Sequence, residues 1–223
     1  MSVIVVGHNE AETIDRCVRS LRNQSFNDFE IIIVCDGSSD TMSDVATRLV
    51  RQGLADRAFA TSLRGGKSSG ANLAIQDCRG DIIINVDCDC SYDRFAIERL
   101  VRAFDDPAVG GVCGDIRLRN GDMSLFTRFQ EIEYLMTISV GKQIVGAFDQ
   151  VTCLSGAFGG VRREALEMVG AFDAGGGEDL DITLRLRACG WRTAFVPKAV
   201  CYTDVPLNLS AFVRQRLRWE RDS

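Results

Sequence analysis

A short apolar run that ends in two acidic residues constrains this sequence most. Residues 82–86 read Ile-Ile-Ile-Asn-Val, and Asp87, Cys88 and Asp89 follow directly. β-Branched residues in a short unbroken run predict a strand that is buried on both faces, as in a parallel sheet. Because ionised Asp is costly to bury without a partner, the two carboxylates belong at the edge of that sheet. Ligands of open α/β sheets bind outside the carboxyl ends of strands, so the pair marks a candidate site.

The chemistry of this acidic pair leaves two interpretations open. Carboxylate oxygens bind hard cations such as Mg²⁺ or Mn²⁺, and these ions in turn bridge phosphates. Taken alone, Asp87 and Asp89 also fit an Asp-rich turn at the end of a strand, with no ligand. The rest of the chain has to decide between the two.

Strand and helix patterns alternate through the first half, which predicts an α/β fold with a mostly parallel central sheet flanked by helices. We expect one domain, with a seam near residues 105–110 where the pattern changes. The expected strands cover residues 3–6, 29–34, 58–61, 82–87, 109–119, 153–162 and 193–196. The expected helices cover residues 10–23, 42–52, 65–75, 92–104, 123–146, 163–169, 178–189 and 209–221.

Composition narrows the class of protein. The formal net charge of -5 argues against a nucleic-acid partner, which favours a basic surface. The 9 cysteines are scattered and form no C-x-x-C pair, which predicts reduced, mostly buried thiols. The sequence contains neither an uninterrupted apolar stretch of about 18 residues nor a signal peptide, so we expect a soluble, cytoplasmic chain.

Further acids follow the other early strands. Asn9 and Glu10 come after the first expected strand and Asp36 after the second, so all should share one sheet edge with Asp87 and Asp89. Acids gathered in this way need a cation or hydrogen-bond donors to stay ionised together. A metal ion with a nucleotide supplies both. A second role for Asn9, as the N-cap of the next helix with Glu10 in its first turn, is compatible with this one.

Two other segments place polar groups at expected helix starts. Residues 65–67 read Gly-Gly-Lys, so backbone N–H groups and Lys67 could bind an anion, although a flexible turn with a solvated Lys also fits. Residues 175–177 are glycines, and Glu178 and Asp179 follow them. Asp179 suits a general base that a helix start keeps ionised, and simple helix capping is the alternative.

The last expected helix carries Gln215, Arg218 and Trp219 on one face, at positions i, i+3 and i+4. Trp offers a flat surface for a sugar ring, and Arg pairs with diphosphate. A basic solvated helix end with a packing Trp fits the same residues.

Taken in order, these motifs resemble the family 2 glycosyltransferases of the GT-A fold, over essentially the whole chain. The Glu178-Asp179 pair and Gln215-x-x-Arg218-Trp219 are typical of the processive branch, which includes synthases of cellulose, chitin, hyaluronan and poly-N-acetylglucosamine. Residue 177 is Gly where many relatives have Thr. Residues 3–10, 20–25, 29–40 and 66–72 carry the rest of the likeness.

The resemblance implies a Rossmann-like nucleotide-sugar-binding half, residues 1–108, and an acceptor-binding and catalytic half, residues 109–223. It implies an inverting, metal-dependent transfer from a UDP-sugar to a β-linked polysaccharide. Asp179 would be the catalytic base, and Asp87 and Asp89 would hold Mg²⁺ or Mn²⁺. The donor would be bound by Asn9, Glu10, Asp36, Lys67 and Asp87. The acceptor or diphosphate would contact Ser155, Gly156, Glu178, Gln215, Arg218 and Trp219.

Alternatives remain beside this interpretation. One is a non-processive transferase that acts on a lipid or a small glycan, and another is a nucleotide-sugar-binding module without catalysis. Processive relatives carry membrane helices on both sides of this domain, which leaves an excised domain from the cytoplasmic side of a membrane or a natural soluble relative. The expected helix at 123–146 is either an interfacial helix or a core-packing one. Its apolar residues include Phe126, Phe129, Ile132, Leu135, Met136 and Ile144.

Overall fold

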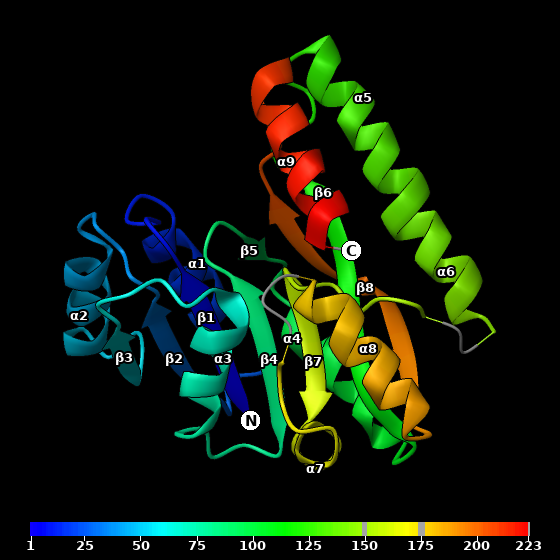
Figure 1. Ribbon diagram of the computed structural model, residues 1–223, viewed down its shortest axis with the longest axis horizontal. Helices are drawn as coiled ribbons and strands as arrows, with labels where there is room; N and C mark the ends of the chain where they lie inside the picture. Colours follow the sequence, from blue (N-terminus) through cyan, green and yellow to red (C-terminus); the bar gives the residue numbers. More distant parts are fainter. Residues whose placement is uncertain (149–150, 174–176, 223) are drawn as a thin grey trace.

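The computed structural model describes residues 1–148, 151–173 and 177–222, and these form an eight-stranded sheet with helices on both faces (Figure 1). The strand order is β3-β2-β1-β4-β7-β6-β8-β5. The strands are β1 (Ser2–Gly7), β2 (Glu30–Cys35), β3 (Arg57–Ala60), β4 (Ile82–Asp87), β5 (Ser91–Tyr92), β6 (Val109–Leu118), β7 (Phe158–Arg162) and β8 (Arg192–Thr203).

Helices cover both faces of the central strands, which explains why those strands are uninterrupted apolar runs. Val3 and Val5 of β1 pack in one core with α1, α2 and α4, while Ile4 and Val6 pack in the other with α3, α7 and α8. The helices are α1 (Ile14–Arg22), α2 (Met42–Arg51), α3 (Lys67–Ile75), α4 (Ala96–Arg102), α5 (Leu125–Tyr134), α6 (Gly141–Gly146), α7 (Arg163–Met168), α8 (Glu178–Ala188) and α9 (Leu209–Asp222).

The predicted α/β architecture is confirmed, and the pairing is parallel from β3 through β2 and β1 to β4. Beyond β4 the sheet is mixed. Strand β7 runs antiparallel between β4 and β6, and β6 pairs in parallel with β8. The mostly parallel sheet expected from the sequence therefore describes the first half of the strand order better than the second.

Strand β8 continues beyond the predicted end at Val196, before Pro197. Its register with β6 jumps from Val196 opposite Gly114 to Val200 opposite Asp115. The intervening residues bulge out of the ladder, so Pro197 can occupy the strand without having to donate a ladder hydrogen bond. The predicted end of this strand at residue 196 was therefore wrong.

Helix α5, a π-helical turn (Leu135–Val140) and α6 follow one another, which confirms the predicted long helix. Figure 1 shows this helix beside α9, above the sheet edge. Phe126 packs on Phe212 of α9, with ring centroids 5.6 Å apart. The core-packing alternative is wrong for most of the helix, because it exposes an apolar stripe, which we define as Phe129, Ile132, Leu135, Met136 and Ile144. Among the residues that the structure describes, no helix is long and apolar enough to cross a membrane.

Candidate active site

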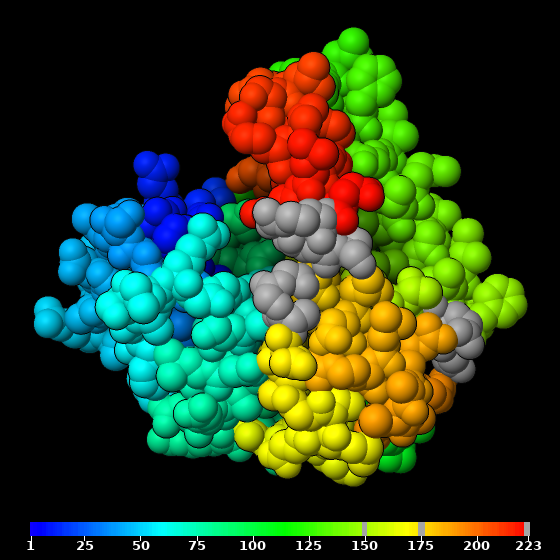
Figure 2. All heavy atoms as spheres, in the orientation of Figure 1, coloured from blue at the N-terminus to red at the C-terminus, as the bar shows by residue number. Residues whose placement is uncertain are grey.

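The carboxyl ends of β1, β2 and β4 lie at one edge of the sheet, because these strands are parallel and in close register. Asp87 ends β4, Asp36 follows β2, and Asn9 and Glu10 follow β1. Figure 2 shows a hollow here, between the blue and cyan N-terminal half and the red helix α9. The dark green of the β4–β5 region forms its floor.

Lys67 joins the two halves of the chain at this edge. Its ammonium group pairs with the carboxylate of Asp87, donates to the carbonyl oxygen of Gly156 at 2.7 Å, and lies 3.5 Å from the carboxylate of Glu178. Burial opposes the charge of Lys67, but the carboxylates of Asp87 and Glu178 together raise its pKa above the usual value. Lys67 is therefore a fixed cation shared between acids from both halves.

Asp179 lies in the first turn of α8, which begins after Gly177 in the left-handed region at φ 68°. One carboxylate oxygen of Asp179 accepts from the Gly156 N–H at 3.0 Å, and the other from the N–H of Leu180 at 2.9 Å. Two backbone N–H groups thus hold the Asp179 carboxylate in one orientation. Gly175 and Gly176, predicted to free the backbone before it, lie outside the described residues.

Gly156 occupies a position that tolerates no side chain without displacement. A Cβ atom there would lie 3.1 Å from both the Glu178 carboxylate and the Lys67 amine, and 3.4 Å from the Asp179 carboxylate. Ser155, the residue before it, is buried and accepts a hydrogen bond from Lys142 at 2.6 Å. The structure therefore brings Ser155 and Gly156 against the groups around Asp179.

Asp87, Asp89 and Cys90 each offer one ligand atom, and these atoms lie within 4.8 Å of one another. The Cys90 thiol donates to the Asp89 carboxylate at 3.4 Å. Burial, followed by the charge of Asp87, raises the pKa of Asp89 to about 6. Two neighbouring carboxylates, one of them with a raised pKa, fit a divalent cation, which would offset their repulsion. Cys90 is a neighbour that the sequence did not assign to this group.

Two arginines hold the turn that carries Asp89. Arg16 of α1 and Arg119, which follows β6, donate to the carbonyl oxygen of Asp89 at 3.1 and 3.4 Å. Arg119 also pairs with Asp204 at 2.5 Å and donates to the hydroxyl of Ser91 at 3.1 Å. Sequence patterns gave no sign of either arginine, because they reach Asp89 from distant segments.

Asp36 is the most deeply placed of the predicted nucleotide-binding acids, with 4% of its surface exposed. Its carboxylate oxygens accept from the N–H groups of Gly65 and Gly66, each at 2.7 Å. Asp36 thereby fixes the loop that leads into α3 and Lys67. This contact brings the end of β2 next to the start of α3.

Asn9 does not cap the helix that follows it, so that prediction was wrong. Helix α1 begins at Ile14, and the side-chain oxygen of Asn9 instead accepts from the N–H of Ser39 at 2.8 Å. Asn9 itself has a φ of 58°, in the left-handed region. Glu10 accepts from the hydroxyl of Thr13 at 2.6 Å, and its charge contributes to the raised pKa of Asp89.

Gln215, Arg218 and Trp219 lie on α9, which forms the red wall of the hollow in Figure 2. The Trp219 side chain is 39% exposed, and its ring centroid lies 6.4 Å from that of Tyr134 on α5. Arg216, which the sequence did not single out, lies 4.3 Å from the Trp219 ring centroid and pairs with Glu133 of α5. Helix α9 is therefore fastened to α5.

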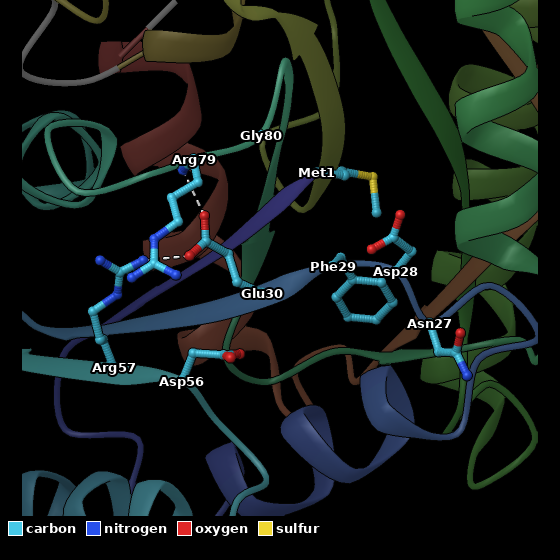
Figure 3. Close-up of a pocket in the computed structure, with 9 residues that line it drawn as sticks. All are labelled: Met1, Asn27, Asp28, Phe29, Glu30, Asp56, Arg57, Arg79 and Gly80. Atoms are coloured by element: carbon cyan, nitrogen blue, oxygen red, sulfur yellow. Dashed lines mark hydrogen bonds and ion pairs between the residues drawn. The ribbon is translucent and has the colours of Figure 1, made fainter.

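A second hollow, of about 450 Å³, lies at the opposite edge of the sheet (Figure 3). Glu30 inside it accepts from the Ser2 hydroxyl and the Arg79 N–H, each at 2.6 Å, and pairs with Arg57. Its lining contains none of the predicted site residues. The lining residues are Met1, Asn27, Asp28, Phe29, Glu30, Asp56, Arg57, Arg79 and Gly80.

Comparison with known proteins adds independent findings. The model of the family described as glycosyl transferase family 2 matches residues 2–170. An N-acetylglucosaminyltransferase of Bradyrhizobium diazoefficiens is 30% identical over 237 residues, which cover 100% of this chain and 48% of that protein. A poly-β-1,6-N-acetyl-D-glucosamine synthase of Staphylococcus aureus is 29% identical over 222 residues, which cover 98% of this chain and 53% of that protein.

The chain thus spans about half the length of the curated relatives it matches. Among solved structures, a mannosyltransferase from Pyrobaculum calidifontis, in complex with GDP-Man and Mn²⁺, superposes with a TM-score of 0.79 at 23% identity. The match covers 99% of this chain and 61% of that one. At this identity the likeness concerns the fold.

Proposed function

This chain belongs to glycosyl transferase family 2, and from that premise we propose that it transfers a sugar from a UDP-sugar to a growing β-linked polysaccharide, with inversion. The observation that carries the proposal is Asp179, held by Gly156 at a helix start within one network with Lys67 and Asp87. The names of two relatives favour N-acetylglucosamine as the transferred sugar.

In the proposed reaction Asp179 accepts the proton of the acceptor hydroxyl as that oxygen attacks the anomeric carbon, and the bond from this carbon to the diphosphate oxygen breaks to release UDP. The N–H of Gly156 orients the accepting carboxylate, and no covalent intermediate is needed. Asp87 and Asp89 would hold Mg²⁺ or Mn²⁺, which would act as a Lewis acid on the diphosphate leaving group. Lys67 adds a fixed positive charge beside the same acids.

We assign the remaining predicted residues to the two sides of the hollow. Asn9, Glu10 and Asp36 lie on the donor side, at the ends of β1 and β2. On the acceptor side, the exposed indole of Trp219 offers a flat face to a sugar ring, and Arg218 offers a guanidinium group to diphosphate.

We further propose that the apolar stripe of α5–α6 rests on the cytoplasmic surface of a membrane in the complete protein. Exposed apolar side chains along one helix are typical of an interfacial contact. The chain spans about half the length of its curated relatives, which is consistent with a catalytic part of a larger protein.

The proposed reaction is tested by Mn²⁺- or Mg²⁺-dependent UDP release from a panel of UDP-sugars, comparing the wild-type protein with Asp179→Asn. We expect UDP-N-acetylglucosamine to be the best donor, and turnover to fall by about 10²–10⁴-fold in the variant. UDP affinity, measured by calorimetry, should be unchanged.

The matched control is Asp44→Asn, which makes the same change in the first turn of α2 and should retain turnover. Turnover by Asp179→Asn at the wild-type rate would remove Asp179 from its role. UDP binding without turnover in the wild-type protein would favour a nucleotide-sugar-binding module. Single additions to a lipid or a small glycan would favour the non-processive alternative.

A further inference from the structure

Lys142 lies on the long helix formed by α5, the π-helical turn and α6, and its side chain points toward the sheet. It belongs to none of the sequence motifs and has no role in the proposed reaction. It lies in the first turn of α6, and its amine donates to the hydroxyl of Ser155 at 2.6 Å. The same amine lies 3.8 Å from the thiol of Cys113 on β6. Ser155 itself is only 6% exposed, so its hydroxyl is largely shielded from water.

Ser155 belongs to the segment of residues 154–156, and each residue of this segment makes a hydrogen bond to a neighbouring element. The Leu154 N–H donates to the hydroxyl of Thr183 at 2.8 Å, one helical turn beyond Asp179. Gly156 donates to Asp179 at 3.0 Å and accepts from Lys67 at 2.7 Å. Because the peptide between Ser155 and Gly156 is planar, the position of Ser155 limits where the Gly156 N–H points.

The helix that supplies Lys142 has a second polar attachment to the sheet. The Ser139 hydroxyl donates to the buried carboxylate of Asp115 on β6 at 2.5 Å. The two attachments lie less than one helical turn apart on the inward side, and the apolar stripe lies outside. A shift of this helix would therefore move the amine of Lys142 away from the hydroxyl of Ser155.

We propose that Lys142 is a positioning residue for Asp179. Its hydrogen bond to Ser155 fixes the N–H of Gly156, and that N–H fixes the carboxylate of the base. Lys142 thereby couples the α5–α6 helix to the reacting centre. The inference rests on the proposed role of Asp179 and adds a residue from a different element to it.

A double-mutant cycle between Lys142→Met and Ser155→Ala tests this chain of contacts. Each variant should lower kcat by about 10–100-fold, the scale expected for a misplaced catalytic group, while the KM for UDP-N-acetylglucosamine changes less than about twofold. The double variant should be no slower than the slower single variant, because both changes remove the same hydrogen bond. Gln143→Met, an exposed change on the same helix turn, should retain the wild-type rate.

Amide exchange supplies a readout that does not need turnover. NMR of the wild-type and Lys142→Met proteins should show the Gly156 amide exchanging at least about tenfold faster in the variant, because its partner Asp179 is no longer aligned. Lys142→Arg keeps a donor and should restore part of the protection. Ser155→Ala, which removes the acceptor of the same hydrogen bond, takes the place of Lys142→Met if that variant fails to fold.

Several outcomes would overturn the proposal. Unchanged kcat and unchanged Gly156 exchange in Lys142→Met would remove Lys142 from this role, and the same result in Ser155→Ala would do so if Lys142→Met does not fold. Rate losses that multiply in the double variant, with a raised acceptor KM, would instead place Lys142 in direct contact with the acceptor. A wild-type protein as inactive as Asp179→Asn would contradict the proposed function, while the exchange measurement would still decide whether Lys142 positions Asp179.

Discussion

The two edges of the sheet carry similar side chains in opposite electrostatic arrangements. At the carboxyl edge, Asp87 and Asp89 lie close together, and burial with the neighbouring charge raises the pKa of Asp89 to about 6. At the opposite edge, Glu30 is surrounded by donors and an ion pair, which outweigh its burial and lower its pKa. The two edges therefore differ in whether hydrogen bonds and ion pairs outweigh burial: they do so at Glu30 and do not at Asp89.

The largest effect is expected from a substitution that disrupts the acidic pair at the carboxyl edge. Asp89→Ala removes one of the two proposed metal ligands, so metal-dependent UDP affinity should fall by more than the roughly 10–100-fold that is typical of losing an outer-shell partner. Calorimetry with Mn²⁺, repeated with EDTA, measures it. Binding of equal strength in the variant, insensitive to EDTA, would contradict the metal assignment.

An intermediate effect is expected at the opposite edge, and it concerns stability rather than activity. Glu30→Gln weakens the ion pair with Arg57 and the hydrogen bonds from Ser2 and Arg79, so we expect a loss of about 1–3 kcal/mol in the free energy of unfolding. Urea unfolding measures that loss. UDP release at the wild-type rate is the accompanying expectation, and a selective loss of turnover in a stably folded variant would give this edge a functional role.

The smallest expected effect is the pH dependence of the free energy of unfolding, which differs in sign between Asp89 and Glu30. A raised pKa means that the folded protein holds the proton of Asp89 more tightly, so this group stabilises the fold fully below its unfolded value of 3.8 and loses that contribution as pH rises through about 6. Without metal, stability should therefore gain about 1 kcal/mol from this group between pH 7 and pH 5.

Glu30 has the opposite sign, because its pKa is lowered. Its contribution is present above the unfolded value of 4.5 and is lost only as pH falls further. Unfolding curves of wild type and Asp89→Asn between pH 7 and pH 5 separate the two groups. A variant with the same pH dependence as wild type would show that Asp89 does not titrate in this range.

The acids at the site edge could be predicted because each follows its own strand. A buried parallel strand is visible as a local apolar run, and strand polarity then places Asp36 and Asp87 at a common edge. The helix that carries Asp179 was equally predictable, since the acids and the apolar face lie within one short segment.

The supporting residues could not be predicted in this way, because their partners are distant in the sequence. Lys142 donates a hydrogen bond to Ser155, and Arg119 donates one to the carbonyl oxygen of Asp89. The guanidinium group of Arg216 lies over the ring of Trp219. Two of these contacts, at Ser155 and Asp89, join elements that only the folded chain brings together. Asn9 illustrates the same limit, since its oxygen bonds to the loop after β2 instead of the adjacent helix.

Strand β7 has a mechanical consequence for any working cycle. It pairs with β4 so that Phe158 lies opposite Val86, and the N–H of Asp87 donates to the carbonyl oxygen of Ala157 at 3.4 Å. Gly156, whose N–H donates to Asp179, thus sits one residue from a backbone ladder that ends at Asp87. A hinge motion between the two halves of the chain would have to break the backbone hydrogen bonds between β4 and β7. The ladder therefore sets the spacing between Asp87 and the segment that holds Asp179, which are the groups that the proposed reaction assigns to the leaving-group side and to the base.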